Sequence, residues 1–235
     1  MTTDPTSGTA PARPSGAAGP AGASAPEPDD TVLDAAAGAA LIRDQRARVV
    51  AATSMDGRVL FGAWGVAWLV GYVTMWAAWP EDPRIELSYG AATGVFVGLL
   101  LAAGTVTAIH VARRSAGVRG TSAAQGAMYG WAWFLTFAGV AALGGWLGGR
   151  EVPSDVMAVT MTVVSTLVVG ALYMAGGAML NEPSQFVLGA WICVANVAGL
   201  LAGAPALLLV MGVAGGGGML LAALVEHVRR HRGAA

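Results

Sequence analysis

The sequence predicts an all-α protein: a polytopic transmembrane helical bundle whose six spans form three hairpins, preceded by a disordered tail and a short interfacial helix. Composition is the first observation. Of 235 residues, 55% are hydrophobic and only 11% are charged, and the mean hydropathy is +0.61. A water-soluble surface needs more charge than this. The second observation is six apolar runs of membrane length, none of which contains Asp, Glu, Arg or Lys. The chain therefore belongs in a lipid bilayer.

Residues 1–30 consist mostly of Pro, Ala, Gly, Ser and Thr. They carry almost no large apolar side chain, so burial cannot offset the entropy that is lost on ordering, and we expect a disordered tail. A secretory signal would show a basic start followed by an apolar core, and this region shows neither. The first apolar run is therefore expected to be a membrane anchor.

A short helix is expected within residues 31–58. Thr31 and Asp34 have the spacing of a capping box, and good helix formers follow over residues 32–52. Basic side chains would hold such a helix on anionic headgroups, at about 1 kcal/mol for each residue. The arginines of this segment are Arg43, Arg46, Arg48 and Arg58. A solvated linker helix is the alternative interpretation.

The six-helix transmembrane domain is expected over residues 59–226, followed by a basic cytoplasmic tail at 227–235. The predicted spans are 59–79, 87–111, 123–148, 156–180, 185–202 and 206–225. At about 1.5 Å per residue, helices of about 18 to 26 residues cover roughly 27 to 39 Å, which is enough for a hydrocarbon core of about 30 Å. The fifth run is the shortest, and only residues 203–205 separate it from the sixth. Five spans with one re-entrant segment are the alternative.

Short connections make successive spans antiparallel neighbours, which gives three hairpins. Orientation follows from the arginines, because cytoplasmic flanks retain basic residues. Of the 13 basic residues, all of them arginine, only Arg84 and Arg150 fall in the loops expected outside, 80–86 and 149–155. Both termini are therefore expected in the cytoplasm. The absence of lysine beside abundant Ala, Gly and Arg is typical of a GC-rich bacterial genome, so the expected membrane is the bacterial plasma membrane.

The sequence offers little for chemistry. A net charge of −1 gives no basic excess for nucleic acid, and one cysteine, Cys193, excludes a disulfide or a Cys-rich metal site within one chain. The chain has no HExxH, GxSxG or P-loop motif and no paired carboxylates within the spans. We therefore expect no catalytic residue, metal or cofactor, and predict that the protein is not an enzyme. His110, at the inner end of the second span, is interpreted as an interfacial polar residue, with a pH-sensing role as the alternative.

Asn196 is the only carboxamide deep within a span. The fourth and fifth spans pair about a short turn, which places Asn196 opposite Val169 and within a turn of Thr166 and Ser165. Thr162 joins these two residues on one helix face by i, i+3 and i+4 spacing. This cluster of Asn196, Thr166, Ser165 and Thr162 is either a set of interhelical hydrogen bonds or a substrate site near the midplane of the membrane.

Stripes of small residues predict close helix packing, because lipid supplies no hydrophobic drive for helices to associate. The second span carries Gly90, Gly94 and Gly98, and the first carries Ala63, Ala67 and Gly71.

Glycines also gather in the middle of the sixth span, at Gly212, Gly215, Gly216, Gly217 and Gly218. We expect this segment to stay helical, because unsatisfied backbone groups are costly in lipid. Gly212 and Gly216 have GxxxG spacing, which favours a packing role. A bend needed for alternating access is the alternative.

Three segments resemble a group of uncharacterised six-span membrane proteins from actinobacteria. They are Tyr-Gly-Trp-Ala-Trp at 129–133, Met-Gly-Val-Ala-Gly-Gly-Gly-Gly at 211–218 and Leu-Val-Glu-His at 224–227. The likeness covers the membrane part and not the tail. Members of that group are loosely labelled as transporters, so the resemblance implies no activity and no functional residue.

Two classes of function follow. The primary hypothesis is a permease-like protein that moves a small neutral or weakly polar solute, because compact hairpins, glycine-rich helices and a polar cluster are compatible with a pathway. The alternative is a non-transporting membrane subunit or scaffold of a larger complex. The lack of charge in the spans favours this alternative, since ion-coupled carriers commonly hold a charged residue there. Expected partners are the lipid bilayer and either a second copy or other membrane subunits, but not nucleic acid.

Overall fold

The computed structural model describes residues 35–53, 56–115 and 121–233. The expected disordered tail and the capping box of Thr31 and Asp34 lie outside these residues. All regular secondary structure within them is helical, so the predicted all-α class is confirmed. The first helix, α1 (Ala35–Thr53), falls in the segment where a short helix was expected. Its place on a membrane surface stays a prediction.

Six helical stretches of membrane length follow α1. Their elements are α2 (Gly57–Ala77), α3 (Tyr89–Ser115), α4 (Thr121–Gly148), α5 (Ser154–Leu180), α6 (Pro183–Ala202) and a last stretch made of α7 (Ala206–Val210), the π-helical segment η1 (Met211–Gly216) and α8 (Gly217–Gly233). Each is long and apolar enough to cross a membrane. The six predicted spans are therefore confirmed, with boundaries that differ by a few residues.

The last helix is longer than the sequence predicts. Residues 227–233, expected as a basic tail, continue α8 by about two turns. An ion pair at i, i+4 spacing supports this extension, because Arg230 Nε donates to Glu226 Oε1 at 2.7 Å.

The turn between α5 and α6 is short and well capped. Asn181 adopts a left-handed conformation with φ of 55°, and its N–H donates to the carbonyl of Gly177. This is an ordinary way to end a helix, and asparagine is one of the few residues that tolerate it. Pro183 is the first residue of α6. Proline has no N–H, which is tolerated here because the first N–H groups of a helix have no carbonyl partner within it. The chain reverses direction here within a few residues.

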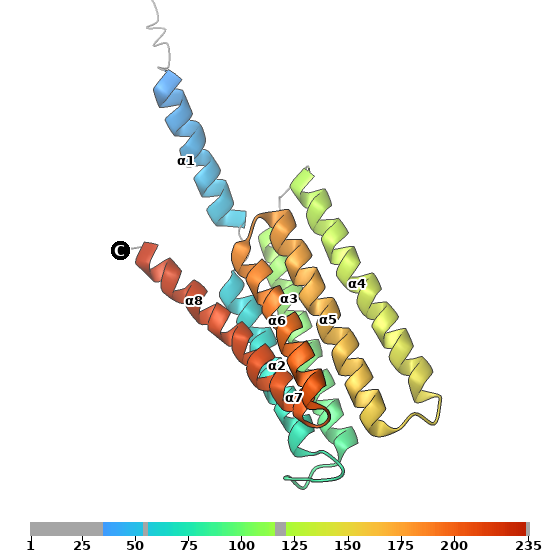
Figure 1. Cartoon of the computed structure of the whole chain (residues 1–235). Helices are drawn as coiled ribbons and strands as arrows, with labels where there is room; N and C mark the ends of the chain where they lie inside the picture. Colours follow the sequence, from blue (N-terminus) through green and yellow to red (C-terminus); the bar gives the residue numbers. More distant parts are fainter. Residues whose placement is uncertain (1–34, 54–55, 116–120, 234–235) are drawn as a thin grey trace, which may run out of the picture. The chain divides into compact units, whose positions relative to one another are not determined.

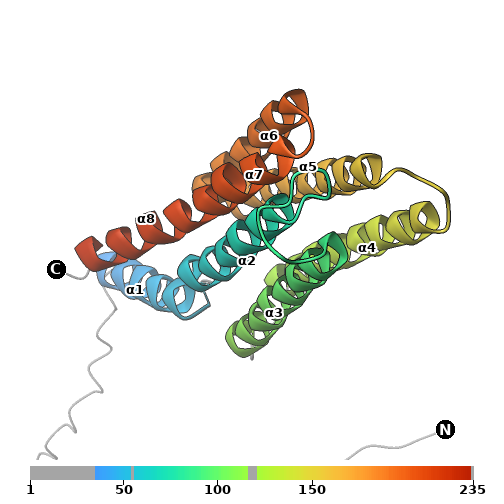
Figure 2. The same ribbon diagram turned by 90° about the horizontal axis from the view of Figure 1, so that it is seen from below.

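Successive helices form the three predicted hairpins. α2 packs along α3, α4 along α5, and α6 along α7 and η1, while α5 and α6 join two of these hairpins (Figure 1). η1 and α8 pack along α2, so the last span lies beside the first (Figure 2). α4 is the exception, because it packs against α5 and makes few contacts with α3 among the described residues.

Aromatic side chains fill the space between α2, α3, α4 and α5. The Tyr72 ring of α2 lies 4.4 Å from Phe96 of α3, centroid to centroid. Tyr173 of α5 lies 6.1 Å from Phe61 of α2 and 5.7 Å from Trp133 of α4. Such pairs add to stability beyond the area that they bury. The space between these four helices is thus packed with aromatic rings.

Glycine permits a close contact between the backbones of α5 and α6. A Cβ placed on Gly189 of α6 would lie 2.6 Å from the carbonyl oxygen of Gly170 on α5, so any larger residue would force the two backbones apart. The stripe of Gly90, Gly94 and Gly98 behaves differently. No atom lies within 4 Å of a Cβ built at any of these three positions. The stripe therefore makes no close contact with the described helices of this chain, because α3 meets α2 through another face, and its packing role stays a prediction.

Candidate functional site

The carboxamide of Asn196 crosses from α6 to the backbone of α5. Its Nδ2 donates to the carbonyl oxygen of Val163 at 3.1 Å. The Thr166 hydroxyl donates to the carbonyl of Thr162 at 2.8 Å and makes a longer contact of 3.4 Å with the same Val163 oxygen. Asn196 and Thr166 therefore share an acceptor and do not bond each other.

The other half of the Asn196 amide is unsatisfied. Its Oδ1 is buried and has no hydrogen-bond partner among the described residues, although the whole residue is only 1% exposed. A buried carbonyl oxygen without a donor costs roughly 1 to 3 kcal/mol. The site thus contains one buried oxygen acceptor that is not hydrogen-bonded to any described residue.

The hydrogen bond lies closer to the start of α5 than the sequence predicts. Simple pairing about the turn placed Asn196 opposite Val169, whereas its partner is the carbonyl of Val163. Helix carbonyls point toward the C-terminus, so this oxygen lies near the level of Thr166, one turn further along α5. The predicted depth holds to about a turn, but the partner is a backbone atom that side-chain patterns do not reveal.

The remaining members of the predicted cluster differ in burial. Thr162 and Thr166 are buried, at 5% and 0% exposure. Ser165 is half-buried. The structure therefore brings Asn196, Thr166 and Thr162 together and leaves Ser165 at the edge of the cluster.

Three glycines of η1 let the last span lie against α2. A Cβ on Gly216 would lie 2.6 Å from the backbone nitrogen of Leu69 and 2.9 Å from the carbonyl oxygen of Gly65. On Gly212 and Gly215, a Cβ would lie 3.1 Å from atoms of the side chains of Val73 and Trp68, respectively. Backbone cannot move aside as a side chain can, so Gly216 is the tightest of the three.

The next two glycines, in α8, face different surroundings. A Cβ on Gly218 would lie 2.7 Å from Nε1 of Trp191 on α6, whereas one on Gly217 would meet nothing within 4 Å. The same indole nitrogen donates to the carbonyl of Ala214 within η1 at 2.8 Å. This hydrogen bond connects the π-helical segment η1 to α6. These contacts favour the packing interpretation, and the segment stays helical as expected, although in the rarer π form.

Sequence reasoning missed the π turn and its partner Trp191. Four consecutive glycines predict a weak helix. They do not predict a π turn, because the donor that binds its Ala214 carbonyl, the Trp191 indole, comes from another helix. The pattern of small residues does not contain that information.

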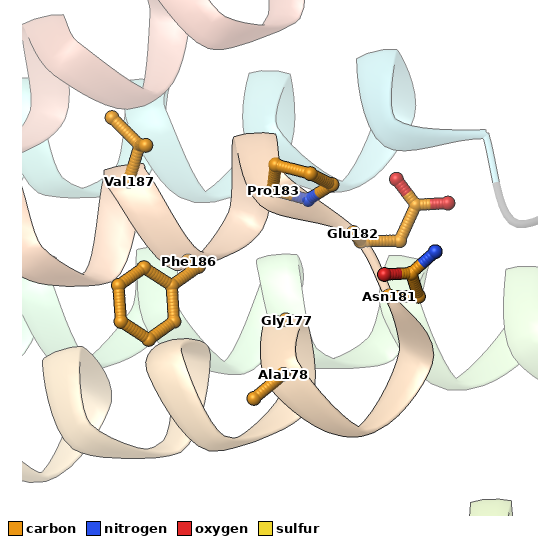
Figure 3. Close-up of a pocket in the computed structure, with 7 residues that line it drawn as sticks. All are labelled: Gly177, Ala178, Asn181, Glu182, Pro183, Phe186 and Val187. Carbon is orange, nitrogen blue, oxygen red and sulfur yellow. The ribbon is translucent and has the colours of Figure 1, made fainter.

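Two surface hollows lie away from the polar cluster. One, of about 300 Å³, lies on the exposed face of α4 against Gly130, Trp131 and Phe134. The other, of about 240 Å³, lies at the α5–α6 turn, where Gly177, Glu182 and Phe186 are among its lining residues (Figure 3). Neither includes Asn196. The Asn196 side chain is instead buried between α5 and α6.

The chain matches no protein-family model, no curated protein and no solved structure. Its assignment therefore rests on its own residues. The six helices of membrane length expose large apolar side chains on their outer faces, such as Leu101 of α3, Phe134 of α4 and Leu201 of α6. Water would not tolerate so much apolar surface, whereas lipid tails would cover it. The chain is an integral, multi-pass membrane protein whose environment is a lipid bilayer.

Proposed function

We propose that this protein is permease-like and moves a small, neutral solute that can donate a hydrogen bond. One observation carries the proposal: the buried Oδ1 of Asn196 lacks a donor, while Nδ2 of the same amide is bound to Val163. A purely structural amide in a membrane tends to find partners for both ends. A donor that arrives and leaves would explain why one end is open.

The chemistry around Asn196 supports a neutral solute. The nearest polar side chains, Thr162 and Thr166, are uncharged hydroxyls. An ammonium or a carboxylate would lose its hydration shell there without a counter-charge, which is costly at the centre of a bilayer. Solutes with N–H or O–H groups and no net charge, such as small amides and alcohols, suit the site.

Transport by this route requires the packed helices to separate around the cluster. η1 supports such a movement, because π turns interrupt the regular ladder of an α-helix and often mark functional positions. The absence of a paired-carboxylate or metal motif in the sequence supports a role without catalysis. The arginine distribution further supports a bacterial plasma membrane location with both termini in the cytoplasm.

Flux measurement in vesicles tests the permease proposal. Purified protein is reconstituted into liposomes, and shrinkage or swelling is followed by light scattering after mixing with urea, formamide, glycerol or a disaccharide. We expect faster equilibration for one or more of the small neutral solutes and none for the disaccharide. The variant Asn196→Leu, which has similar volume and no acceptor, should lose that flux.

Gln185→Leu is the matched control for Asn196→Leu. It removes a carboxamide near the start of the same helix, one that donates to the Tyr129 hydroxyl of α4 and lies outside the cluster. Flux that survives Asn196→Leu, or protein-free rates for every solute, would contradict the proposal.

A membrane subunit without transport activity is the second candidate. It is favoured by α4, because no residue in the most apolar 18-residue window of this helix is buried within the chain. Met128, Trp131 and Leu135 each expose more than half of their surface. A helix with so little support inside its own chain gains from another helix. Purification in a mild detergent tests this candidate, because a stoichiometric partner held by α4 would be lost in a Gly130→Leu variant.

A further inference from the structure

We infer that two histidines latch the ends of α2, α3 and α8 together and that protonation of these histidines releases the latch. We define the basic end as the end of the helical unit where α2 begins and where α3 and α8 finish. The inference does not depend on transport through the Asn196 cluster. It rests on the side chains that meet at this end.

His110 connects α3 to the start of α2. The backbone N–H of Asp56 donates to its Nε2 at 3.2 Å. An imidazole nitrogen can accept only while it carries no proton, so this contact requires neutral His110 with its proton on Nδ1. If His110 were protonated on both nitrogens, its Nε2–H and the N–H of Asp56 would both be donors, and the hydrogen bond could not form.

His227 makes the corresponding contact from α8. Its Nδ1 lies 3.4 Å from Nη1 of Arg58, near the start of α2. A guanidinium nitrogen can only donate, so Nδ1 must be the acceptor, and the neutral tautomer has its proton on Nε2. Protonated His227 would set a second cation against Arg58. Both contacts therefore exist only with neutral histidine.

The anchor of the latch does not titrate over the same range. Arg58 donates to Oδ1 of Asp56 through Nε at 2.9 Å and to Oδ2 through Nη2 at 2.7 Å. These hydrogen bonds lower the pKa of Asp56 to about 2, although burial opposes the shift. Asp56 thus stays ionised wherever histidine titrates, and both of its oxygens are already engaged by Arg58.

The other charged groups at this end add positive charge. α3 carries Arg113 and Arg114 beyond His110, and α8 carries Arg229, Arg230, His231 and Arg232 after His227. Glu226 of α8 approaches Gly57 and is paired with Arg230, so its charge is already partly compensated. The His231 ring lies 4.5 Å from that of His227. These cations repel a protonated histidine while the helix ends are joined, so the protonated form is more stable when the ends separate.

When both histidines are neutral, both acceptors are available and the three helix ends are joined. When both carry a second proton, both contacts are lost, so the ends of α3 and α8 separate from α2. The device is a pH-dependent opening of the basic end.

Electron-spin distance measurement tests the latch in the full-length protein. Spin labels are placed at Ala112 of α3 and Val228 of α8 in a Cys193→Ala background, and the protein is reconstituted in lipid nanodiscs. We expect a single short distance at pH 8 and a growing longer component as the pH falls to 5. A distribution that is the same at both pH values would overturn the inference.

Non-titrating variants separate the latch from general acid effects. His110→Gln and His227→Asn place an amide oxygen near the positions of the two accepting nitrogens, so the double variant should keep the short distance at both pH values. His231→Asn, the matched control, should respond to pH as the unaltered protein does. A double variant that opens on acidification would overturn the inference.

A fixed cation offers a test that does not depend on amide geometry. His227→Arg places a permanent charge beside Arg58 and should show the longer component already at pH 8. If this variant were as closed as the unaltered protein at pH 8, the proposed repulsion would be absent and the inference would fail.

Discussion

At the scale of single residues, Asn196 shows how far a sequence can point to a site. Its rarity within apolar runs singled it out, and its depth was predicted to about one turn. The acceptor that it uses, the Val163 carbonyl, has no sequence signature, because every residue carries one. Likewise, only coordinates reveal that Oδ1 lacks a donor.

The shared acceptor predicts weak coupling between Asn196 and Thr166. Asn196→Ala should cost about 0.6 kcal/mol, and not more than about 2, as is usual for interhelical hydrogen bonds in membranes. Because Thr166 also approaches the Val163 oxygen, a double-mutant cycle with Thr166→Val should give a coupling energy of about 0.5 to 1.5 kcal/mol. Unfolding in mixed micelles measures it. Ser165→Ala serves as control, since it should be additive with Asn196→Ala; additivity for Thr166 as well would disprove the shared contact.

Asp56 predicts an acid-dependent contribution to stability. Its pKa is lowered from 3.8 to about 2 in the folded protein by hydrogen bonds from Arg58, so its stabilising effect is complete above pH 3.8 and disappears as the pH falls through about 2. Asp56→Asn keeps a good helix-capping side chain but removes the charge. Its melting temperature should lie below that of the unaltered protein at pH 7, and the difference should shrink between pH 4 and pH 2.

Asp155→Asn is the comparison for Asp56→Asn. Asp155 lies exposed in the first turn of α5, so its substitution should change the melting temperature little at any pH. If the deficit of Asp56→Asn were the same at pH 2 as at pH 7, the assignment of the lowered pKa to the folded state would be wrong.

At the scale of elements, length and composition predicted where the helices lie in the sequence better than which face of each helix contacts its neighbours. Six apolar runs gave six helices because hydrocarbon leaves the backbone no other way to satisfy its polar groups. The outward face of the Gly90, Gly94 and Gly98 stripe was not predictable, because small residues favour close contact with any helix, in this chain or in another. The extension of α8 beyond residue 226 was not predicted, because the apolar run ends at residue 225 and the residues that follow are mostly charged or polar.

The glycines of the last span predict that alanine substitutions will change stability by different amounts at neighbouring positions. Gly216→Ala should lose about 1 to 3 kcal/mol, because the new methyl group would meet the backbone of Leu69 and Gly65. Gly217→Ala should be neutral or gain up to about 1 kcal/mol, since the site is open and alanine favours helix. Gly218→Ala should fall between them, because Trp191 is a side chain that can shift. Thermal unfolding in detergent provides the measurement.

Leucine substitutions extend this test of packing. Gly217→Leu should be tolerated, whereas Gly216→Leu should prevent the last span from docking on α2. Equal loss at both positions, or loss at neither, would rule out packing as the purpose of the tract. In that case, loss of flux with unchanged stability in the alanine variants would support the alternative, a bend needed for transport.

At the scale of the whole molecule, the structure constrains which ends share a side of the membrane. Contacts between Asp56 and His110 and between Arg58 and His227 bring the start of α2 together with the ends of α3 and α8. A chain that crosses six times must meet this condition, and an odd number of crossings would not. Hairpin connectivity was predictable from loop length, while the packing of η1 and α8 along α2 depends on glycine contacts between distant segments.

Arginine placement then predicts which side is the cytoplasm. Only Arg84 and Arg150 lie in the loops at the other end, where each stacks on a neighbouring indole: the Arg84 guanidinium carbon is 4.2 Å from the Trp76 ring centroid, and that of Arg150 is 3.4 Å from the Trp146 ring centroid. Arginine held on tryptophan in this way suits the boundary between headgroups and hydrocarbon. We therefore predict that residues 80–86 and 149–155 face outward and that both termini are cytoplasmic.

Cysteine labelling in intact cells tests this orientation. Single cysteines at Asp82 and Ser154, both exposed in the structure, are introduced into a Cys193→Ala background and treated with a thiol reagent that cannot cross the membrane. Both should react without lysis, while a cysteine at Gly117, in the connection after α3, should react only after permeabilisation. Because the outer loops carry two arginines and the opposite flanks carry most of the rest, the imbalance is large enough to orient the chain. Protection of both loop cysteines together with labelling at Gly117 would mean that the topology is inverted, and labelling of only one loop cysteine would mean that the number of crossings differs from six.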